Sequence, residues 1–337
     1  MSVLVTGGAG YIGSVTAEAL RARGREVVVL DDLSTGHRAA VPDGVSFLRG
    51  SAGNAALLGD LLRRREITSV MHFAARSIVA ESVADPALYW RINVDETLAL
   101  LGALREPGIR HFIFSSSAAV YEGGEGTALS EKSPLAPGNP YGATKAAVER
   151  ALADFSSAYG MRAVSLRYFN AAGATSSHGE DHRPETHLVP LALRAARGEG
   201  GELDLYGTDY PTRDGTCVRD YVHVSDLADA HVLALEALEA GYPGGALNLG
   251  NGRGFSVREV IETVEDVTGR RVPVREAPRR PGDPGTLVAG SEKAREDLGW
   301  RPRFAAIREI IASAAAWMET HPGGYGPAGP GPAEGGA

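Results

Sequence analysis

The chain has 337 residues, enough for one large α/β domain or two closely associated ones. Hydrophobic residues make up 43% and charged residues 23%, as is typical of a soluble globular protein. No apolar run is long enough to cross a membrane, and we expect no signal peptide before the first strand. The net charge of −8 argues against a general nucleic-acid-binding protein, because such a chain would repel a phosphate backbone. The single cysteine, Cys217, excludes an internal disulfide, so we expect a cytoplasmic protein.

Short β-branched runs alternate with helix-like stretches through the first half of the chain. The expected strands are Val3–Thr6, Val27–Leu30, Val70–Phe73, Phe112–Ser115 and Ala163–Arg167. The expected helices are Ser14–Arg23, Ala55–Arg64, Tyr89–Arg105 and Tyr141–Tyr159. Alternation at this spacing predicts an α/β fold with a doubly wound parallel sheet and right-handed crossovers.

The second half has longer loops and shorter elements from about Asn170 onward. We expect residues 1–170 to form the sheet domain, with segments near 221–250 returning to it, and residues 171–320 to form a smaller α/β lobe. Residues 321–337 are rich in Gly and Pro and are expected to form a mobile tail, because such a segment buries too little surface to offset its ordering entropy.

A glycine-rich turn, Gly7-Gly8-Ala9-Gly10-Tyr11-Ile12-Gly13, directly follows the first strand and opens a helix. Glycine is needed where a backbone turns sharply and approaches a pyrophosphate, whose charge then lies at the helix N-terminus. The next strand ends on Asp31, where a carboxylate accepts hydrogen bonds from ribose hydroxyls and repels a 2′-phosphate. Strand, turn, helix and acid together predict a Rossmann-type domain that binds NAD rather than NADP.

A second motif pairs Tyr141 with Lys145, and Ser115-Ser116-Ser117 ends an earlier strand. Positions i and i+4 share one helix face, so the phenol and the ammonium project together. A lysine cation and a positively charged nicotinamide both lower the pKa of a phenol, which then removes a proton from a substrate hydroxyl as hydride leaves the same carbon. Ser117 would hold the substrate oxygen. Lysine occurs only three times in this chain, which makes its presence here more informative.

With these motifs in place, the chain resembles the UDP-glucose (UDP-galactose) 4-epimerases of the extended short-chain dehydrogenase/reductase family. The resemblance runs from the glycine turn to about Trp300. Its most distinctive segments are Gly207–Asp226 (GTDYPTRDGTCVRDYVHVSD), Asn248–Ser256 and Ala277–Pro284.

The resemblance implies that NAD stays bound and is regenerated in every cycle of a UDP-hexose 4-epimerisation, a reaction of galactose metabolism. Tyr141 would deprotonate the C4 hydroxyl while hydride passes from C4 to NAD. The 4-keto sugar would then turn over and receive hydride and proton on its other face.

The resemblance also implies site residues, which fall into three sets. The catalytic residues would be Tyr141, Lys145 and Ser117. The residues that bind the cofactor would be Gly7, Gly10, Tyr11, Ile12, Gly13, Asp31, Asp32, Leu33, Ser34, Thr35, Gly36, Ser51, Ala52, Phe73, Ala74, Ala75, Ser77, Asn93, Ser115, Tyr141, Lys145 and Phe169. The residues that bind the UDP-sugar would be Ser117, Tyr141, Asn170, His187, Leu188, Tyr206, Arg219, Arg280, Asp283 and Leu287.

Four positions depart from the family pattern. Ser51 stands where an aspartate usually follows glycine, so the adenine contact of that carboxylate is missing or replaced. Arg76 follows His-Phe-Ala-Ala, Glu96 replaces a glycine in Asn-Val-x-Gly-Thr, and Glu122 replaces the glycine after Val-Tyr. None of these positions belongs to the catalytic trio.

Two further expectations concern metals and assembly. The segment His178–His182, followed by Glu185 and His187, lacks regular ligand spacing on a helix, and the resemblance assigns it to a substrate loop, so we expect no metal. Apolar side chains on the helices at 89–105 and 141–159 are expected to be core, and in similar proteins these helices also form a homodimer interface.

Three alternatives to a UDP-hexose 4-epimerase differ from it in residues that the sequence shows. A sugar-nucleotide 4,6-dehydratase shares the fold but carries an Asp-Glu pair where this chain has Ala118-Ala119, so dehydration is not expected. A dinucleotide-sensing regulator would not need Tyr141 and Lys145. The third is a different sugar, since Leu287 stands where residue size decides whether an N-acetyl group fits. UDP-glucose and UDP-galactose are therefore the first choice, and the N-acetylated pair or another nucleotide sugar is the alternative.

Overall fold

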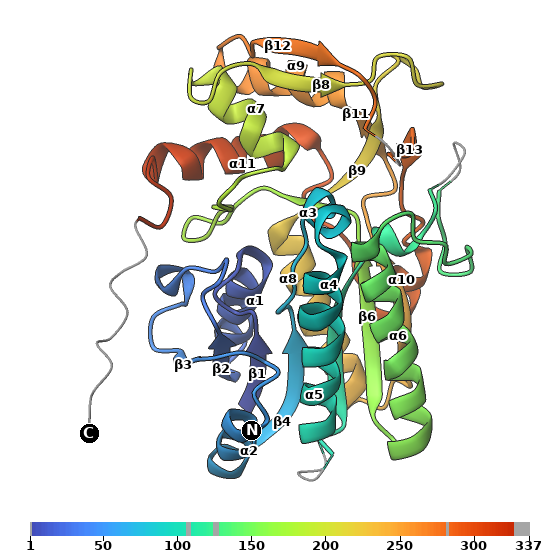
Figure 1. The fold of residues 1–337 in the computed structure, drawn as a ribbon. Coiled ribbons are helices and arrows are strands. Elements are labelled where there is room, and N and C mark those ends of the chain that lie inside the picture. Colours follow the sequence, from blue (N-terminus) through green and yellow to red (C-terminus); the bar gives the residue numbers. More distant parts are fainter. Residues whose placement is uncertain (1, 106–108, 124–127, 281–282, 327–337) are drawn as a thin grey trace.

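The computed structural model describes residues 2–105, 109–123, 128–280 and 283–326, and its centre is a parallel sheet of seven strands (Figure 1). The strand order is β10-β6-β5-β4-β1-β2-β3. The strands are β1 (Ser2–Thr6), β2 (Glu26–Asp31), β3 (Ser46–Arg49), β4 (Ile67–His72), β5 (His111–Ser117), β6 (Arg162–Tyr168) and β10 (Gly245–Leu249). The order reverses between β1 and β4, so their carboxyl ends border the crevice in which doubly wound folds bind ligands.

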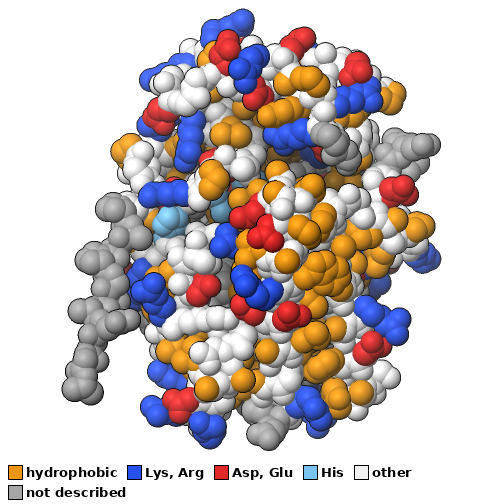
Figure 2. All heavy atoms as spheres, viewed as in Figure 1, with side chains coloured by type: hydrophobic (Ala, Val, Ile, Leu, Met, Phe, Trp, Pro, Cys, Tyr) orange, Lys and Arg blue, Asp and Glu red, His pale blue; other side chains and the backbone are white. Residues whose placement is uncertain are grey.

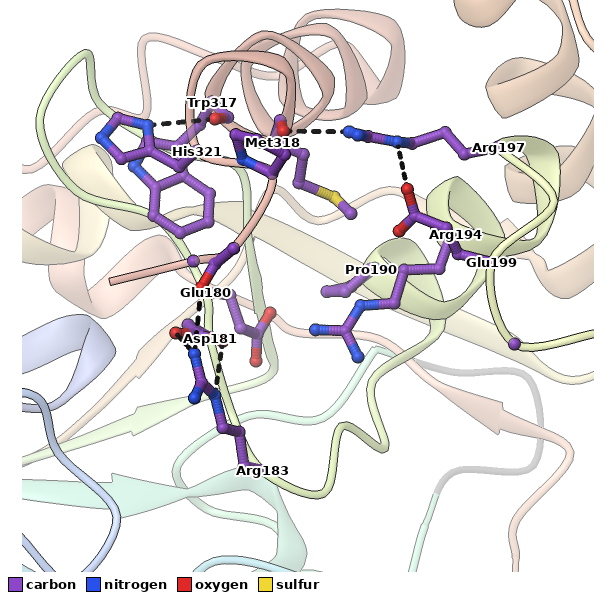
Figure 3. A pocket seen from close by; sticks show the side chains of 14 residues that line it. Glu180, Asp181, Arg183, Pro190, Arg194, Arg197, Glu199, Trp317, Met318 and His321 are labelled. Atoms are coloured by element: carbon purple, nitrogen blue, oxygen red, sulfur yellow. Dashed lines mark hydrogen bonds and ion pairs between the residues drawn. The ribbon is translucent and has the colours of Figure 1, made fainter. Parts of the chain in front are cut away.

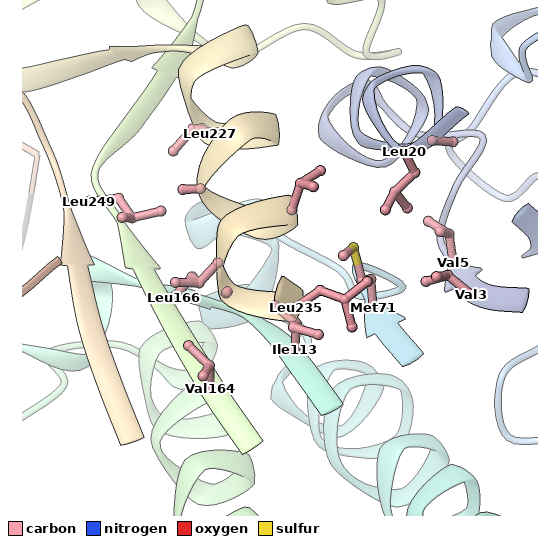
Figure 4. Packing of buried hydrophobic residues seen from close by; sticks show 14 of the residues in the cluster. Val3, Val5, Leu20, Met71, Ile113, Val164, Leu166, Leu227, Leu235 and Leu249 are labelled. Atoms are coloured by element: carbon pink, nitrogen blue, oxygen red, sulfur yellow. The ribbon is translucent and has the colours of Figure 1, made fainter. Parts of the chain in front are cut away.

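Helices cover both faces of this sheet. On one face lie α1 (Tyr11–Ala22) and α8 (Val224–Glu239), which bury Leu20, Leu227 and Leu235 against the sheet (Figure 4). The other face is covered by α2 (Ala55–Arg64), α5 (Glu96–Ala103) and α6 (Pro140–Tyr159). The inner strands of the sheet are buried on both sides, which explains why apolar runs such as Val3–Val5 and Val27–Leu30 show no alternation.

The predicted fold class is confirmed, and three elements differ from the sequence prediction. The strand β3 was not predicted, because it is a short edge strand with a partly exposed, polar sequence. The long helix α8 was not predicted either. The predicted helix Tyr89–Arg105 is helical as far as Ala103 but is not a regular α-helix: α4 (Pro86–Tyr89) runs into a π-helical segment, Trp90–Asp95, and then into α5. A π-helical turn changes the direction of side chains without changing composition, so hydrophobic periodicity does not reveal it.

The second lobe lies above the carboxyl ends of the strands (Figure 1). It contains a sheet of β11 (Gly254–Ser256), β9 (Val218–His223) and β13 (Thr286–Leu287), with β7 (Asn170–Ala172) also paired to β9. A two-stranded sheet joins β8 (Leu203–Tyr206) to β12 (Val274–Ala277). The helices α7 (Leu188–Ala196), α9 (Val257–Thr268) and α11 (Ile307–Thr320) enclose a separate hydrophobic core.

The remaining elements are short. They are α3 (Val79–Ala84), α10 (Glu292–Leu298) and the 3₁₀ turns Arg38–Ala40 and Ala118–Val120. Within the part of the chain that the structure describes, no helix is long and apolar enough to cross a membrane.

Residues 327–337 of the expected mobile tail lie outside the described residues. The first part of that segment packs on the protein: the Tyr325 backbone N–H donates to Asp181 Oδ2 at 3.0 Å, and the Tyr325 ring stacks on His37.

Candidate active site

The glycine turn after β1 leaves the start of α1 open to a ligand. Gly10 is the N-cap of α1 and no side chain caps the helix, so its first N–H groups are free for an anion. A Cβ on Gly7 would lie 2.4 Å from the Ala74 nitrogen, and one on Gly13 would lie 2.2 Å from the Gly7 oxygen. A Cβ on Gly10, in contrast, would meet only the Gly7 oxygen, at 3.3 Å. Gly7 and Gly13 therefore pack too closely on neighbouring backbone atoms to carry a side chain. The backbone around Gly10 remains accessible, which fits the binding of a dinucleotide pyrophosphate.

Asp31 ends β2 beside this turn and is nearly buried. Its Oδ2 accepts from the Ala9 N–H at 2.9 Å, and its Oδ1 accepts from the Leu33 N–H at 2.8 Å. Burial raises the pKa of Asp31, and the two backbone bonds oppose that shift. Each carboxylate oxygen keeps a further lone pair, so Asp31 can still accept from ribose hydroxyls.

Asn93, in the π-helical segment, joins the loop after β4 to the helix that carries the predicted catalytic pair. Its Oδ1 accepts from the Arg76 N–H at 2.8 Å, and its Nδ2 donates to the Arg76 carbonyl and to Thr144 Oγ1, both at 3.0 Å. Thr144 Oγ1 in turn donates to the Tyr141 carbonyl at 2.7 Å. The π-helical turn thus directs a buried amide inward, where it fixes the first turn of α6.

The structure brings Tyr141, Lys145 and Ser117 together at the carboxyl end of β5. Asn139 caps α6 by accepting from the Gly142 N–H at 2.9 Å, which sets where the helix begins. Lys145 Nζ donates to the Ser115 carbonyl at 2.8 Å and lies 5.8 Å from the centre of the Tyr141 ring. The Ser117 hydroxyl lies near Tyr141 and acts to lower the pKa of its phenol, and Ser117 Oγ accepts from the Ala119 N–H at 3.1 Å. The three groups can therefore act on one oxygen.

Protonation in this cluster is governed by burial. Burial raises the pKa of Tyr141, and the hydrogen bond with Ser117 opposes that shift. Burial also lowers the pKa of Lys145 to about 7, against the attraction of Glu149. The predicted lowering of the Tyr141 pKa by Lys145 is therefore not found in the protein alone. A phenol kept protonated here can donate to an oxygen, and it needs further positive charge nearby to give its proton up.

Behind Lys145 lies a buried ion pair that the sequence did not reveal. Arg167 Nε and Glu149 Oε1 are 2.9 Å apart, and both side chains are buried. Ser116 Oγ donates to the same carboxylate at 2.5 Å, and Arg167 Nη1 donates to the Tyr121 hydroxyl at 2.7 Å. The pair connects α6 to β5 and β6. Glu149 lies on a helix and Arg167 on the following strand, and their spacing in the sequence does not predict an ion pair. Only the folded structure shows that the two side chains are in contact.

Two of the departures from the family pattern meet in space. Ser51 Oγ donates to Glu96 Oε2 at 2.6 Å and accepts from the Gly53 N–H at 2.9 Å. The preceding residue, Gly50, donates its N–H to the carbonyl of Asp31 at 3.0 Å. A carboxylate carried by α5 therefore lies in the loop after β3, next to the strand end that holds Asp31.

The residues predicted to bind a UDP-sugar form two neighbouring groups in the second lobe. Arg219 Nη2 lies 2.5 Å from Asp283 Oδ1. Nearby in the chain, the Arg280 guanidinium lies over the Tyr206 ring, 3.9 Å from its centre. Guanidinium groups pair bidentately with phosphate, so both side chains are chemically suited to the predicted role at a diphosphate.

Leu287 pairs with Arg219 between β13 and β9 and packs against a buried cluster that includes Ala118 and Phe169. It therefore links the second lobe to the cluster that contains the residue after Ser117. Asn170 Nδ2 donates to the Asp220 carbonyl at 3.0 Å. His187 directly precedes α7 and Leu188 begins it, and the His187 ring contacts Glu180 and Glu185.

The other residues predicted to bind the cofactor follow the strands of the main sheet in order. After β1 and β2, and in the loops that follow β3, β4 and β6, lie Tyr11, Ile12, Asp32, Leu33, Ser34, Thr35, Gly36, Ser51, Ala52, Phe73, Ala74, Ala75, Ser77 and Phe169. The Tyr11 hydroxyl donates to the Gly173 carbonyl at 2.5 Å, so its side chain reaches toward the second lobe.

Known proteins match the chain over nearly its full length. The model of the "NAD dependent epimerase/dehydratase family" matches residues 3–250. A UDP-glucose 4-epimerase of Lacticaseibacillus casei is 48% identical over 328 residues, which are 97% of this chain and 99% of that protein.

Solved structures agree with these sequence matches. The crystal structure of UDP-glucose 4-epimerase from Brucella ovis in complex with NAD is 47% identical, with a TM-score of 0.90 over 93% of this chain and 97% of that one. The structure of the enzyme from Bifidobacterium longum in complex with NAD⁺ and UDP is 36% identical, with a TM-score of 0.91 over 96% of this chain and all of that one.

Proposed function

The chain belongs to the NAD dependent epimerase/dehydratase family, and from this premise we propose that it interconverts UDP-glucose and UDP-galactose by NAD-dependent inversion at C4 of the hexose. The observation that carries the proposal is the convergence of Tyr141, Lys145 and Ser117 at the sheet edge that also holds the open helix N-terminus and Asp31.

We propose the cofactor residues from their position around this edge. The first N–H groups of α1 receive the pyrophosphate, and Asp31 accepts from the adenosine ribose. The Glu96 carboxylate, held by Ser51, takes the place of the missing aspartate and accepts from the adenine amine. When bound, NAD takes hydride from C4 of the sugar, returns it, and adds positive charge beside Tyr141.

Tyr141 acts as the acid and base on the C4 oxygen. In the oxidising half-reaction it accepts the C4 hydroxyl proton, and in the reducing half-reaction it returns a proton to the same oxygen on the inverted carbon. Ser117 donates a hydrogen bond to that oxygen as its charge changes. Lys145, fixed on the Ser115 carbonyl, keeps positive charge next to the phenol, and the buried Glu149 favours the charged form of Lys145.

Inversion requires a firm grip on the nucleotide and a loose one on the sugar. Arg219 and Arg280 hold the diphosphate, with Asp283 orienting Arg219 and the Tyr206 ring supporting Arg280. The 4-keto hexose then rotates about the diphosphate linkage and presents its other face to the cofactor. In this division residues 1–170, with segments near 221–250, hold NAD, and residues 171–320 hold the nucleotide sugar.

Assembly and location are also part of the proposal. Val83, Trp90, Leu98 and Tyr159 are large apolar side chains that remain exposed on α3, the π-helical segment, α5 and α6. Figure 2 shows hydrophobic side chains gathered over this side of the molecule. A monomer rarely exposes such a surface, so we assign it to a homodimer interface. The single cysteine suits a reducing compartment, and we place the enzyme in the cytoplasm.

Substitution of Tyr141 by Phe tests the reaction. General acid–base catalysis contributes about 10²–10⁴-fold, so Tyr141→Phe should lower kcat by that factor while purified protein still contains NAD. Tyr159→Phe, at the exposed opposite end of α6, is the matched control. Unchanged turnover of Tyr141→Phe would exclude this mechanism, whereas a wild type that binds NAD but shows no turnover would favour a dinucleotide-binding regulator.

One observation bears on the sugar. Leu287 packs against the buried cluster that contains Ala118, the residue after Ser117, so we expect its size to limit the space near the catalytic trio. The comparisons favour UDP-glucose and UDP-galactose over the N-acetylated pair. Leu287→Ala should raise the rate with UDP-N-acetylgalactosamine relative to UDP-galactose, and an unchanged ratio would place Leu287 away from C2.

A further inference from the structure

The loop between β7 and α7 gathers four side chains that the reaction does not use as a group. Glu180, His182, Glu185 and His187 each offer one nitrogen or oxygen atom that could bind a metal, and these atoms all lie within 4.8 Å of one another. His187 Nδ1 lies 2.7 Å from Glu180 Oε1 and 2.8 Å from Glu185 Oε1, and His182 Nδ1 lies 3.1 Å from Glu180 Oε1.

One atom of this cluster is left without a partner. The Glu185 side chain is 1% exposed, and its Oε1 already accepts from the backbone N–H groups of Thr186 and His187 at 2.7 and 2.8 Å. Its Oε2 is buried and has no hydrogen-bond partner among the residues that the structure describes. A buried carboxylate oxygen without a donor is costly, so the site needs a further positive group beside Glu185.

Protons alone do not complete this arrangement. The Glu180 side chain is 6% exposed, so two carboxylates share a nearly dry site. Protonating both imidazoles would balance their charge, but it would place two donors on Glu180 Oε1 and none on Glu185 Oε2. A divalent cation with two neutral imidazoles balances the same charge and can bind the oxygen that protons leave unpaired.

We propose that Glu180, His182, Glu185 and His187 bind one Zn²⁺ ion. Two imidazoles and two carboxylates without thiolate form a ligand set that Zn²⁺ accepts with tetrahedral geometry, whereas Ca²⁺ and Mg²⁺ prefer oxygen ligands throughout. The ion has a route from solvent, because Glu180 also lines a cavity of about 420 Å³ between this loop, α7 and α11 (Figure 3).

The ion would act on the position of the loop rather than on the reacting carbon. His187 binds through Nδ1, which fixes its ring and leaves Nε2 as the free nitrogen of a side chain that remains 42% exposed. His187 directly precedes α7, so the ion also ties the start of that helix to the loop. The role of His187 toward the UDP-sugar rests on the proposed function, whereas the zinc site itself does not.

The sequence did not predict this site, because Glu-x-His-x-x-Glu-x-His has neither the helical nor the paired spacing of common zinc motifs. The loop has no regular structure between Gly173 and His187, and only its folded path brings the four side chains to one point.

The test is the zinc content of untagged enzyme, measured by plasma mass spectrometry after gel filtration in metal-free buffer. We expect about one Zn²⁺ per chain in the wild type. Glu185→Gln is nearly isosteric and should weaken Zn²⁺ binding by more than the about 10–100-fold that loss of an outer-shell partner costs. Glu199→Gln, which removes another carboxylate on the rim of the same cavity, is the matched control and should retain the ion.

A second readout uses the wild type alone and does not depend on a variant folding. A chelator should lower the Tm of the wild type, and added Zn²⁺ should restore it. Co²⁺ bound in place of Zn²⁺ should give the visible absorption of a tetrahedral site. NAD that stays bound throughout shows that the main domain is intact. Wild-type protein that neither contains nor binds Zn²⁺, or Glu185→Gln protein that binds it as tightly, would overturn the proposal. If the wild type bound Zn²⁺ but had no epimerase activity, the proposed function would be refuted and the zinc site would still be supported.

Discussion

The pairing of Ser51 with Glu96 makes a specific prediction about cofactor retention. If Glu96 supplies the carboxylate that faces the adenine amine, Glu96→Gln should speed the release of NAD. The substitution is conservative, because the glutamine carbonyl still accepts from Ser51 Oγ, whose bond to Glu96 is 2.6 Å long. The loop after β3 therefore keeps its position and only the charge is lost.

The size of the effect follows from the type of hydrogen bond. A hydrogen bond to a charged group contributes about 1.5–3 kcal/mol, which corresponds to about 10- to 150-fold in Kd. Most of that change should be in the dissociation rate. Ser51→Asp alone places two carboxylates in contact and should also weaken binding. The double variant Ser51→Asp/Glu96→Gly returns one carboxylate to the same place and should recover most of the loss.

The assay is the exchange of bound NAD for isotopically labelled NAD, followed by mass spectrometry of the cofactor released on denaturation. Asp95→Asn is the matched control, because it removes the same charge from the adjacent, exposed residue. If Glu96→Gln exchanged NAD no faster than Asp95→Asn, the carboxylate would not face the cofactor. Equal losses in both single variants and in the double variant would refute the compensation between the two positions.

Three further predictions concern stability and assembly. Glu149→Gln leaves a buried guanidinium unpaired and should destabilise the protein by about 3–5 kcal/mol in denaturant titrations, whereas Asp154→Asn, in an exposed pair on the same helix, should change stability by less than about 1 kcal/mol. Burial raises the pKa of Asp220 to about 6 from an ordinary 3.8, so its contribution to stability is complete below pH 4 and is lost as the pH rises through 6. The free energy of unfolding of the wild type relative to Asp220→Asn should therefore fall by about 3 kcal/mol from pH 4 to pH 7, and a flat difference would contradict the assignment. If the proposed homodimer forms, light scattering should show a dimer for the wild type, a monomer for Leu98→Asp and a dimer for Leu135→Asp, whose leucine is exposed elsewhere.

The sequence predicted those parts of the fold in which local pattern and burial coincide. Strands such as β1 and β2 are buried on both faces and contain the apolar runs Val3–Val5 and Val27–Leu30. The edge strand β3 is partly exposed and carries no such run. The π-helical segment was missed because its sequence is that of an ordinary helix, although its geometry is what directs Asn93 inward.

The residues of the candidate site likewise divide into those that local spacing predicts and those that only the fold brings together. Tyr141 and Lys145 are four residues apart on one helix, so their meeting could be predicted from spacing. Ser51 and Glu96 are 45 residues apart, and each looked like a separate departure from the family pattern until the fold brought them together. The glutamates and histidines of the β7–α7 loop are close in sequence, yet their convergence depends on an irregular backbone path that no periodicity describes.

The proposed reaction inverts C4 of a UDP-hexose with NAD that the enzyme retains. It can be tested by proton NMR of purified enzyme with UDP-galactose, in buffer without added NAD. UDP-glucose signals should appear and grow to equilibrium. If the protein contained one NAD per chain and UDP-galactose remained unchanged, the proposed reaction would be wrong.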